Sequence, residues 1–434
     1  MTSRTHRRPI TAAAFAAVLA LVLSACGGGD DGDAEAGDGT VSVLVVWGGE
    51  ELASFEAMVA PFTEETGIDV EIESTRDLNA VLTTRLAGGN PPDVAGLPGP
   101  GAMAEFARAG DLQPLPQEVL DVLAAEYNEG VVADATVDDE LVGIFVKSSV
   151  KGQIWYNPAA FDAAGYEVPE DWDALDSLVE EAAAAGTPPW GITLESGASS
   201  GWPATDWIED FVLRQSGPDV YDAWVDGELA WTSDEIRQAW ESFGEWATDP
   251  AYVSGGPDTV LTSPFGNGGD CLFSDPPGCL MHHQASFITT FFEDNNPGVA
   301  EAGVSYDFFP MPQIDFDGVT YAGDLFGMFN DTPQAQALME YLVTAEAQQI
   351  WVERGGALSS NQSVPLEAYP DDSSRRSAEL LVGAEVLRFD GSDLMPAEMN
   401  DAFWGAVLEY VQNPDGLDGI LANLDEVQES AYEG

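Results

Sequence analysis

Hydrophobic and polar positions follow strand and helix patterns in turn near the start of the chain. Residues 41–47, VSVLVVW, form an apolar run typical of a buried strand, and residues 68–73, IDVEIE, alternate as a half-buried strand does. Between them, apolar side chains recur at helical spacing, and Gly67 is suited to ending that helix. These apolar positions are Phe55, Met58, Val59 and Phe62. The pattern predicts a strand–helix–strand unit.

The same alternation continues over the next forty or so residues. A second helix is predicted by Leu78, Val81, Leu82 and Leu86, a third strand by PPDVAGL (91–97), and a third helix by Met103 and Phe106. This βαβαβ order predicts a parallel sheet with right-handed crossovers.

Further along the chain, the pattern changes. Residues 140–157 read as two strands with no helix between them, and we expect the chain to leave one lobe for another there. A helix-rich stretch follows, and Asp331-Thr332-Pro333 predicts the start of a long helix, because proline is tolerated in a first turn. One helical face in the helix-rich stretch carries Trp172, Leu175, Val179 and Ala182.

The N-terminus has the pattern of a targeting segment. Basic residues precede an uncharged apolar run over residues 10–23, which is shorter than the ~20 residues that span a bilayer and is typical of a signal peptide. It ends in LSAC (23–26), which resembles the lipobox of bacterial lipoproteins and implies cleavage before Cys26 and lipidation of its sulfur. We expect a signal peptide over 1–25, a Gly/Asp-rich flexible tether over 26–40, and a location on the outer face of the cell membrane, held by the lipid anchor only.

Residues 271–284, CLFSDPPGCLMHHQ, group two cysteines and two histidines, which could form a zinc site, a redox pair or a stapled loop. Outside the cytoplasm paired thiols oxidise. The spacing matches no zinc finger or ribbon, and no Cys-x-x-Cys is present. We therefore predict a disulfide between Cys271 and Cys279, and we expect His282 and His283 to be strand residues, with no metal bound.

Charge restricts the partners. The chain has 76 acidic and 14 basic residues, a formal net charge of −62, and its two lysines are Lys147 and Lys151. Such a balance argues against a nucleic-acid partner. The acids are scattered, so we interpret most of them as solvated surface adapted to salty or acidic surroundings.

Several stretches, in order along the mature chain, resemble the extracytoplasmic solute-binding proteins of carbohydrate ABC importers. They include residues 45–73, GGNPPDVAG (88–96), ARAGDLQPL (107–115), residues 141–175 and GGALSSN (355–361). Three others are similar to the α-glucoside-binding branch of that family: SGWPATDWIEDFVLR (200–214), DPPGCLMHHQASF (275–287) and FDGSDLMPAEMNDAFW (389–404).

The resemblance implies an α/β fold of the type II periplasmic-binding-protein kind, with two lobes, a hinge and a ligand cleft between the lobes. It divides the chain into an N-lobe (41–150 and 302–354) and a C-lobe (151–301 and 355–434). It further implies capture of α-glucosides such as maltose, trehalose or sucrose, permease subunits of an ABC importer as partners, no cofactor and a monomeric chain.

Sugar sites combine aromatic surfaces with a few fixed polar groups. The resemblance places eight candidates at the cleft, with Trp404 expected to stack on a sugar ring: Glu50, Asp77, Trp202, Asp206, Gln284, Phe287, Asp324 and Trp404. Each has a structural alternative; Glu50 and Asp206 could be acids at helix starts, and Phe287 could belong to the core. Related gluco-oligosaccharide binders often carry an aromatic residue and an acid where this chain has Leu97-Pro98-Gly99-Pro100, which leaves the number of glucose units open.

The main alternative is an exported glycoside hydrolase with two catalytic carboxylates. Among 76 acidic residues some pair always has a suitable spacing, so this composition carries little information. The sequence has no nucleophile elbow, phosphate loop or His-Glu metal motif, and we expect no enzymatic activity. A metal or siderophore binder using His282 and His283 is a weaker alternative.

Overall fold

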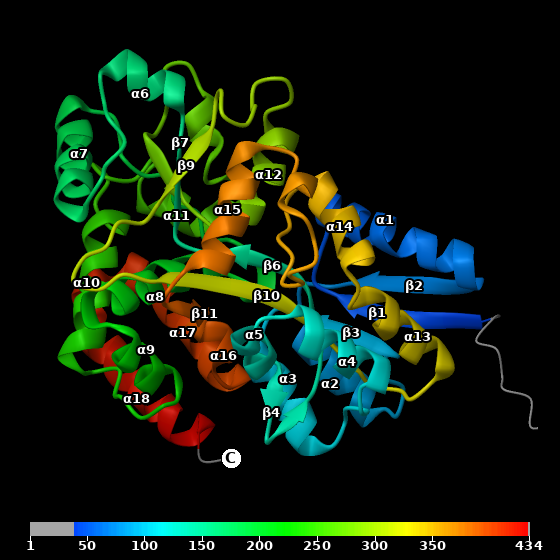
Figure 1. Ribbon diagram of the computed structural model, residues 1–434. Coiled ribbons are helices and arrows are strands. Elements are labelled where there is room, and N and C mark those ends of the chain that lie inside the picture. The colour runs from blue at the N-terminus through cyan, green and yellow to red at the C-terminus, as the bar shows by residue number, and fades with distance from the viewer. Residues whose placement is uncertain (1–38, 433–434) are drawn as a thin grey trace, which may run out of the picture. The chain divides into compact units, whose positions relative to one another are not determined.

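This computed structural model describes residues 39–432 of the chain. These residues pack around two large hydrophobic cores. We call the residues around the first core lobe 1 and those around the second core lobe 2. Lobe 1 takes its core from residues 41–150 and 321–389, and lobe 2 from residues 154–311 and 395–424. A third, smaller cluster around Trp155 and Phe292 belongs to lobe 2. Figure 1 shows lobe 2 with most of the green and red elements and lobe 1 with the blue and cyan ones.

Lobe 1 is built on one mixed sheet in the order β11-β10-β3-β1-β2, with β6 also paired to β10. Helices α1 and α14 lie above β1 and β2 in Figure 1, and α2 and α3 lie below them. The elements of lobe 1 are β1 (Gly39–Val45), α1 (Gly49–Thr66), β2 (Ile68–Ser74), α2 (Leu78–Ala87), β3 (Val94–Leu97), α3 (Pro100–Ala109), α4 (Gln117–Glu126), α5 (Glu129–Asp134), β4 (Thr136–Val137), β5 (Glu140–Leu141), β6 (Ile144–Val150), β10 (Val319–Met328), α13 (Pro333–Leu342), α14 (Ala345–Arg354), α15 (Asp372–Gly383) and β11 (Leu387–Phe389).

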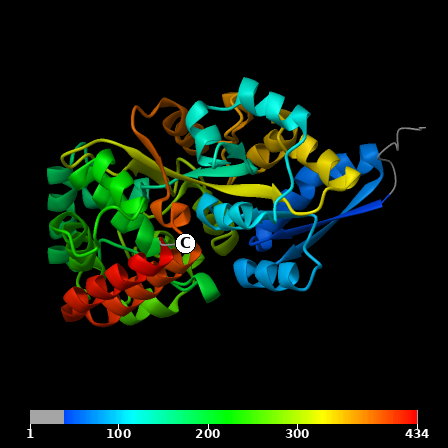
Figure 2. The ribbon, with the colours of Figure 1, turned by 90° about the horizontal axis from the view of Figure 1, so that it is seen from below.

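Lobe 2 contains a three-stranded antiparallel sheet in the order β8-β7-β9, surrounded by helices. Figure 2 shows α17 and α18 side by side along the lower edge of this lobe. The elements of lobe 2 are β7 (Gln153–Tyr156), α6 (Pro158–Ala164), α7 (Trp172–Ala185), α8 (Trp202–Ser216), α9 (Pro218–Val225), α10 (Asp234–Ala247), α11 (Pro257–Thr262), β8 (Met281–His283), α12 (Thr289–Asn295), β9 (Asp307–Pro310), α16 (Gly391–Leu394), α17 (Ala397–Gln412) and α18 (Leu417–Ala431).

The predicted βαβαβ unit is confirmed. Strand β1 pairs in parallel with β2 and with β3, and α1 and α2 connect them. Helix α1 ends at Gly67, whose φ of 74° places it in the left-handed region that glycine adopts at low cost. The predicted long helix after Thr332 is instead two helices, because the Thr344 side chain accepts a hydrogen bond from the Ala347 N–H and so begins α14.

The chain passes between the lobes three times: between β6 and β7, between β9 and β10, and after β11. The first crossing lies at residues 150–153. The second and third differ from the predicted boundaries at 301/302 and 354/355. Strand β9 pairs with β7 of lobe 2. Ala357, Leu358, Ala378 and Leu381 pack in the lobe 1 core, so these crossings come near residues 311–318 and 390.

The cysteine prediction is confirmed, since Cys271 and Cys279 form a disulfide. His282 and His283 lie in β8, paired with β7, as expected. His283 Nε2 is 2.7 Å from a carboxylate oxygen of Asp210, and its ring stacks on Trp207.

The predicted signal peptide and Cys26 lie outside the described residues, and β1 begins at Gly39, inside the predicted tether. Between residues 39 and 432, none of the helices has both the length and the apolar character needed to cross a bilayer.

Candidate functional site

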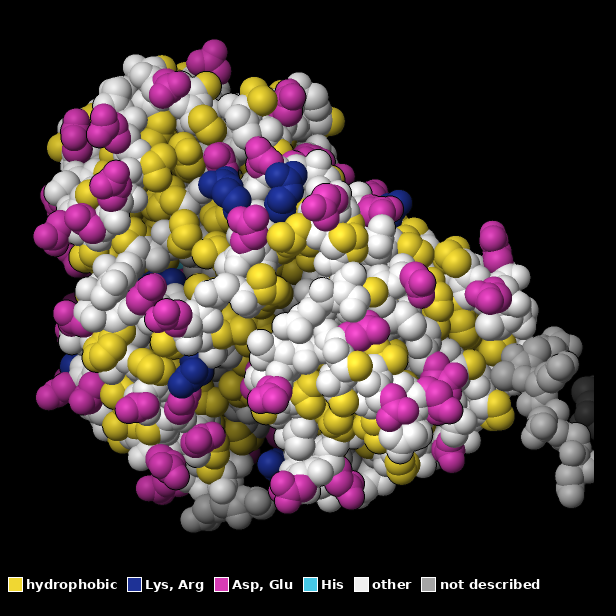
Figure 3. Space-filling model, viewed as in Figure 1, with side chains coloured by type: hydrophobic (Ala, Val, Ile, Leu, Met, Phe, Trp, Pro, Cys, Tyr) yellow, Lys and Arg dark blue, Asp and Glu magenta, His cyan; other side chains and the backbone are white. Residues whose placement is uncertain are grey.

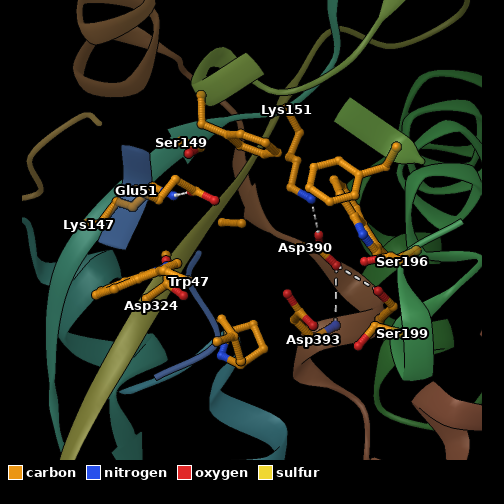
Figure 4. A pocket seen from close by; sticks show the side chains of 18 of the residues that line it. Trp47, Glu51, Lys147, Ser149, Lys151, Ser196, Ser199, Asp324, Asp390 and Asp393 are labelled. Carbon is orange, nitrogen blue, oxygen red and sulfur yellow. Dashed lines mark hydrogen bonds and ion pairs between the residues drawn. The ribbon is translucent and has the colours of Figure 1, made fainter. Parts of the chain in front are cut away.

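A cleft between the two lobes is lined by side chains from five of the eight stretches that carry the family resemblance. Its empty volume is about 850 Å³, part of which is open to solvent, within the range of small-molecule sites. Figure 4 shows Trp47, Asp324 and Lys147 on one side and Ser196, Ser199 and Asp390 on the other. The lining residues are Val46, Trp47, Glu51, Arg76, Pro98, Lys147, Ser149, Lys151, Ser196, Ser199, Trp202, Phe265, Phe287, Ala322, Gly323, Asp324, Asp390, Ser392, Asp393 and Trp404.

On the lobe 1 side, a buried ion pair joins Lys147 of β6 to Glu51 of α1. The Lys147 ammonium also lies 5.1 Å from the ring centroid of Phe287, in lobe 2. Asp324 of β10 lies near this pair. Burial raises the pKa of Asp324 to about 6, although the Lys147 ammonium and a hydrogen bond from Trp47 favour its ionised form.

On the lobe 2 side, Lys151 lies at the first crossing between the lobes and holds two carboxylates. Its ammonium is 2.8 Å from Asp206 Oδ1 and 2.7 Å from Asp390 Oδ2. It also lies 4.9 Å from the ring centroid of Trp202. Burial disfavours the charged lysine, but the two carboxylates outweigh that effect and raise the pKa of Lys151 well above its usual value.

Four carboxyl groups lie near this one ammonium: Asp206 and Asp390 contact it, and Glu209 and Asp393 feel its charge. Burial disfavours an ionised Asp390, yet Lys151 outweighs burial and lowers the pKa of this carboxyl. Burial raises the pKa of Asp206 and of Glu209 well above their usual range. Burial and repulsion by Asp390 raise the pKa of Asp393 to about 8. At neutral pH this side of the cleft therefore holds protons as well as charges.

Aromatic side chains supply the apolar surface. Trp202, Phe265 and Phe287 form a cluster, with the Trp202 centroid 5.2 Å from Phe265 and 6.0 Å from Phe287. Trp404 of α17 is half-buried and lines the same cleft. Gly201, with φ of 112°, brings the start of α8 against the Trp404 backbone, where a Cβ would lie 2.5 Å from the Trp404 carbonyl oxygen. This contact holds the start of α8, with Trp202, next to α17, with Trp404.

Several polar atoms at the cleft lack a hydrogen-bond partner within residues 39–432. They are the Ser196 hydroxyl oxygen, the Trp404 indole nitrogen and Asp206 Oδ2, and all three are buried. Unsatisfied buried polar groups cost free energy. Two of these atoms, on Ser196 and Trp404, belong to residues that line the cleft, where a polar ligand could bond them.

The structure brings four of the eight predicted residues to the cleft lining: Trp202, Phe287, Asp324 and Trp404. Asp206 lies directly behind the lining, bound to Lys151. Three others do not line the cleft. Glu50 is exposed beside Arg354 and Asp77 is exposed at the start of α2, whereas Gln284 is buried and its side-chain oxygen accepts from the Ala285 N–H.

Other lining residues were not predicted from the sequence. At two places the neighbour of a predicted residue lines the cleft, Glu51 instead of Glu50 and Arg76 instead of Asp77. Lys147 and Lys151 carried a usable signal, because they are the two lysines of the whole chain and lie four residues apart. Asp390 and Asp393 occur in the DGSD stretch of a segment that carried the family resemblance.

Comparison with known proteins identifies relatives over nearly the whole chain. The family model of the bacterial extracellular solute-binding proteins matches residues 48–270. The osmoprotective compounds-binding protein GgtB of Synechocystis sp. is 38% identical over 403 residues, which is 91% of this chain and 94% of that protein. The α-glucosides-binding periplasmic protein AglE of Rhizobium meliloti is 36% identical, over 90% of this chain and 87% of its own.

Solved structures confirm the expected fold. A chitin oligosaccharide binding protein superposes with a TM-score of 0.78 at 19% identity, covering 91% of this chain and 99% of its own. This likeness shows the two-lobed type II fold, with the ligand cleft between its lobes.

Proposed function

Because this chain belongs to the bacterial extracellular solute-binding proteins, we propose that it captures neutral α-glucosides and delivers them to the permease of an ABC importer. Maltose, trehalose and sucrose are the candidate ligands. The observation that carries the proposal is the combination of aromatic faces with unsatisfied buried polar atoms in one cleft. Trp202, Phe287 and Trp404 offer surfaces for the C–H faces of a sugar, while Ser196 and the Trp404 N–H can bond its hydroxyls.

The charges favour a neutral ligand. Both lysines of the cleft are already paired with carboxylates, Lys147 with Glu51 and Lys151 with Asp206 and Asp390. An anionic ligand would have to compete with these buried partners for the two ammonium groups, and a cationic one would meet the positive charges of Lys147 and Lys151 in the cleft. Carboxylates and hydroxyls instead accept and share the hydrogen bonds of several sugar hydroxyls.

The names of two relatives support the ligand class. AglE is named for binding α-glucosides and GgtB for binding osmoprotective compounds. Trehalose and sucrose satisfy both descriptions, since each is an α-glucoside and an osmolyte. The second name, together with the net charge of −62, favours osmoprotectant uptake as a second candidate function.

Isothermal titration and thermal unfolding test the ligand class. Maltose, trehalose and sucrose are compared with glycine betaine, a zwitterionic osmoprotectant without a sugar ring. A ligand present at 100 times its Kd should add about 2.7 kcal/mol to the free energy of unfolding. Binding of glycine betaine and of none of the three sugars would contradict the α-glucoside proposal. Release of nitrophenol from p-nitrophenyl glucosides by the purified protein would support the hydrolase alternative instead.

We also propose that binding closes the lobes about the three crossings. Asp324 comes from lobe 1, whereas Trp202, Phe287 and Trp404 come from lobe 2, so a ligand touching both sets is held best when the lobes are together. Small-angle scattering should give a smaller radius of gyration with sugar than without it. An unchanged radius at saturating sugar would contradict closure.

The anchor and the oligomeric state complete the proposal. We expect the mature protein to be a monomer held at the outer face of the cell membrane by lipid on Cys26. Labelled palmitate should enter the wild-type protein and not the Cys26→Ser variant. Absence of label from the wild type would contradict the anchor.

A further inference from the structure

Two glycines lie where lobe 1 touches lobe 2 beside the cleft. Residues 97–101, LPGPG, connect β3 to α3 in lobe 1, and Pro98 of this loop lines the cleft. A Cβ on Gly99 would lie 2.4 Å from the carbonyl oxygen of Asp393. A Cβ on Gly101 would lie 2.1 Å from the carbonyl oxygen of Met395. Real Cβ atoms essentially never come within 3.0 Å of such atoms, so no other residue fits these two positions while the contact is made.

Close approach is the reason for glycine at both positions. Gly99 has an extended backbone, with φ of −150°. Gly101 lies within the first turn of α3, and its φ is not positive. Other residues adopt both conformations without strain. Glycine is therefore required at these two positions for the close packing of α3 against α16, and not for the conformation of the backbone.

The other side of this contact is fixed to lobe 2. The carboxyl group of Glu209, in α8, accepts hydrogen bonds from the backbone N–H groups of Gly391 and Ser392, at 2.8 and 3.0 Å, and so holds α16 in place. Met395 packs in the lobe 2 core. A second bond spans the lobes nearby, because the Ala397 N–H at the start of α17 donates to Glu105 Oε1 of α3, at 2.8 Å.

We infer that the contact of Gly99 and Gly101 with residues 393–395 closes one end of the cleft and limits the ligand to a short saccharide. This inference rests on the proposed α-glucoside function and deepens it. Pro98 and Asp393 face the cleft from the two sides of the contact. In Figure 4, Asp393 lies at the edge of the cleft away from the Lys147–Glu51 pair. A disaccharide fits inside the closed cleft, whereas a longer chain that extends past this edge keeps the loop away from α16 and prevents full closure.

Binding of a homologous series tests the inference. The dissociation constants of maltose, maltotriose and maltotetraose are measured by titration calorimetry for the wild type and for Gly101→Ala. The wild type should bind maltose at least about tenfold more tightly than maltotetraose. In Gly101→Ala the added methyl group meets backbone carbonyls, so maltose should bind about tenfold more weakly, whereas maltotetraose binding should change little. The ratio of the two dissociation constants should therefore shrink to near unity.

Controls separate this effect from damage to the fold. Alanine is a better helix former than glycine, so Gly101→Ala should not unfold α3, and the melting temperature of the ligand-free protein checks this. Gly419→Ala is the matched control, because a Cβ there meets nothing within 4 Å; it should keep the wild-type preference. Gly99→Ala should repeat the effect of Gly101→Ala.

The outcomes distinguish the inference from the proposed function. If the wild type binds maltotetraose as tightly as maltose, or if Gly101→Ala and Gly99→Ala both keep the wild-type ratio, the size limit is wrong and the α-glucoside function stands. If the wild type binds none of the series and neither trehalose nor sucrose, the proposed function itself fails.

Discussion

Lys151 and Asp390 form an ion pair of 2.7 Å that joins two of the three connections between the lobes. Lys151 follows β6, where the chain first enters lobe 2, and Asp390 follows β11, where the chain enters lobe 2 for the last time. Both side chains are buried. The pair therefore fixes the two crossings to each other at the floor of the cleft.

Removing the ammonium should destabilise the protein strongly. In Lys151→Met, Asp206 and Asp390 stay buried without their cation, and removal of one partner of a buried pair typically costs about 3–5 kcal/mol. Urea denaturation at neutral pH measures the loss. Arg237→Ala is the control, since its partner Asp418 is 90% exposed and such surface pairs contribute about 0–1 kcal/mol. Equal effects of the two substitutions would contradict the role assigned to Lys151.

The raised pKa of Asp393, about 8, predicts a pH dependence of stability. A carboxyl whose pKa is raised on folding binds a proton in the folded state that the unfolded chain has already lost. The free energy of unfolding should therefore fall as the pH rises from about 4 to about 8. In Asp393→Asn the free energy of unfolding should fall less steeply between pH 6 and 8, because the asparagine amide has nearly the shape of the aspartate carboxyl but does not titrate.

Urea denaturation at pH 5, 6, 7 and 8 checks this slope. The slope should not vanish in Asp393→Asn, because burial also raises the pKa values of Asp206, Glu209 and Asp324, and these carboxyl groups act in the same direction. Glu64→Gln, on the exposed face of α1, serves as the control for removing one acid. A wild-type stability that rises from pH 6 to 8 would contradict the raised pKa of Asp393.

The fold was predictable because its signals are local. The βαβαβ unit follows from apolar periodicity around Phe55 and Leu82 and from Gly67 at the end of α1, and each of these acts within one element. The boundary near residue 390 was not predictable in this way. Residues 357–389 are apolar enough for either core, and only their packing against lobe 1 decides between the cores.

The site was predictable by segment more than by residue. The segments around Trp202, Phe287, Asp324 and Trp404 all reach the cleft. At the start of α1 the neighbouring Glu51 reaches it instead of Glu50, since successive helical side chains point about 100° apart. The proximity of Lys151 to Asp390 depends on two crossings far apart in the sequence, so no local pattern encodes it.

The excess of acids predicts salt-dependent stability. On the face shown in Figure 3, Asp and Glu side chains are spread over both lobes, and Lys and Arg side chains are few. With a net charge of −62, self-repulsion should weaken as the Debye length shrinks from ~10 Å at 0.1 M salt to ~3 Å at 1 M. The melting temperature should rise over this range of sodium chloride, which is preferred to sulfate because sulfate also strengthens apolar burial. A flat profile would contradict the prediction.

Truncation of Trp404 tests the ligand site most directly. Trp404 is half-buried, lines the cleft and has an indole N–H without a partner within residues 39–432. Trp404→Ala removes an aromatic face and a hydrogen-bond donor, which should weaken binding of the best α-glucoside by about 2 kcal/mol, or about 30-fold in Kd. Trp404→Phe keeps an aromatic ring but lacks the N–H, so its Kd should lie between those of the wild type and Trp404→Ala. The ligand-free melting temperature should change little in Trp404→Phe, which separates lost binding from lost packing. If Trp404→Ala binds the sugar as the wild type does, Trp404 is a packing residue and the sugar contacts other surfaces of the cleft.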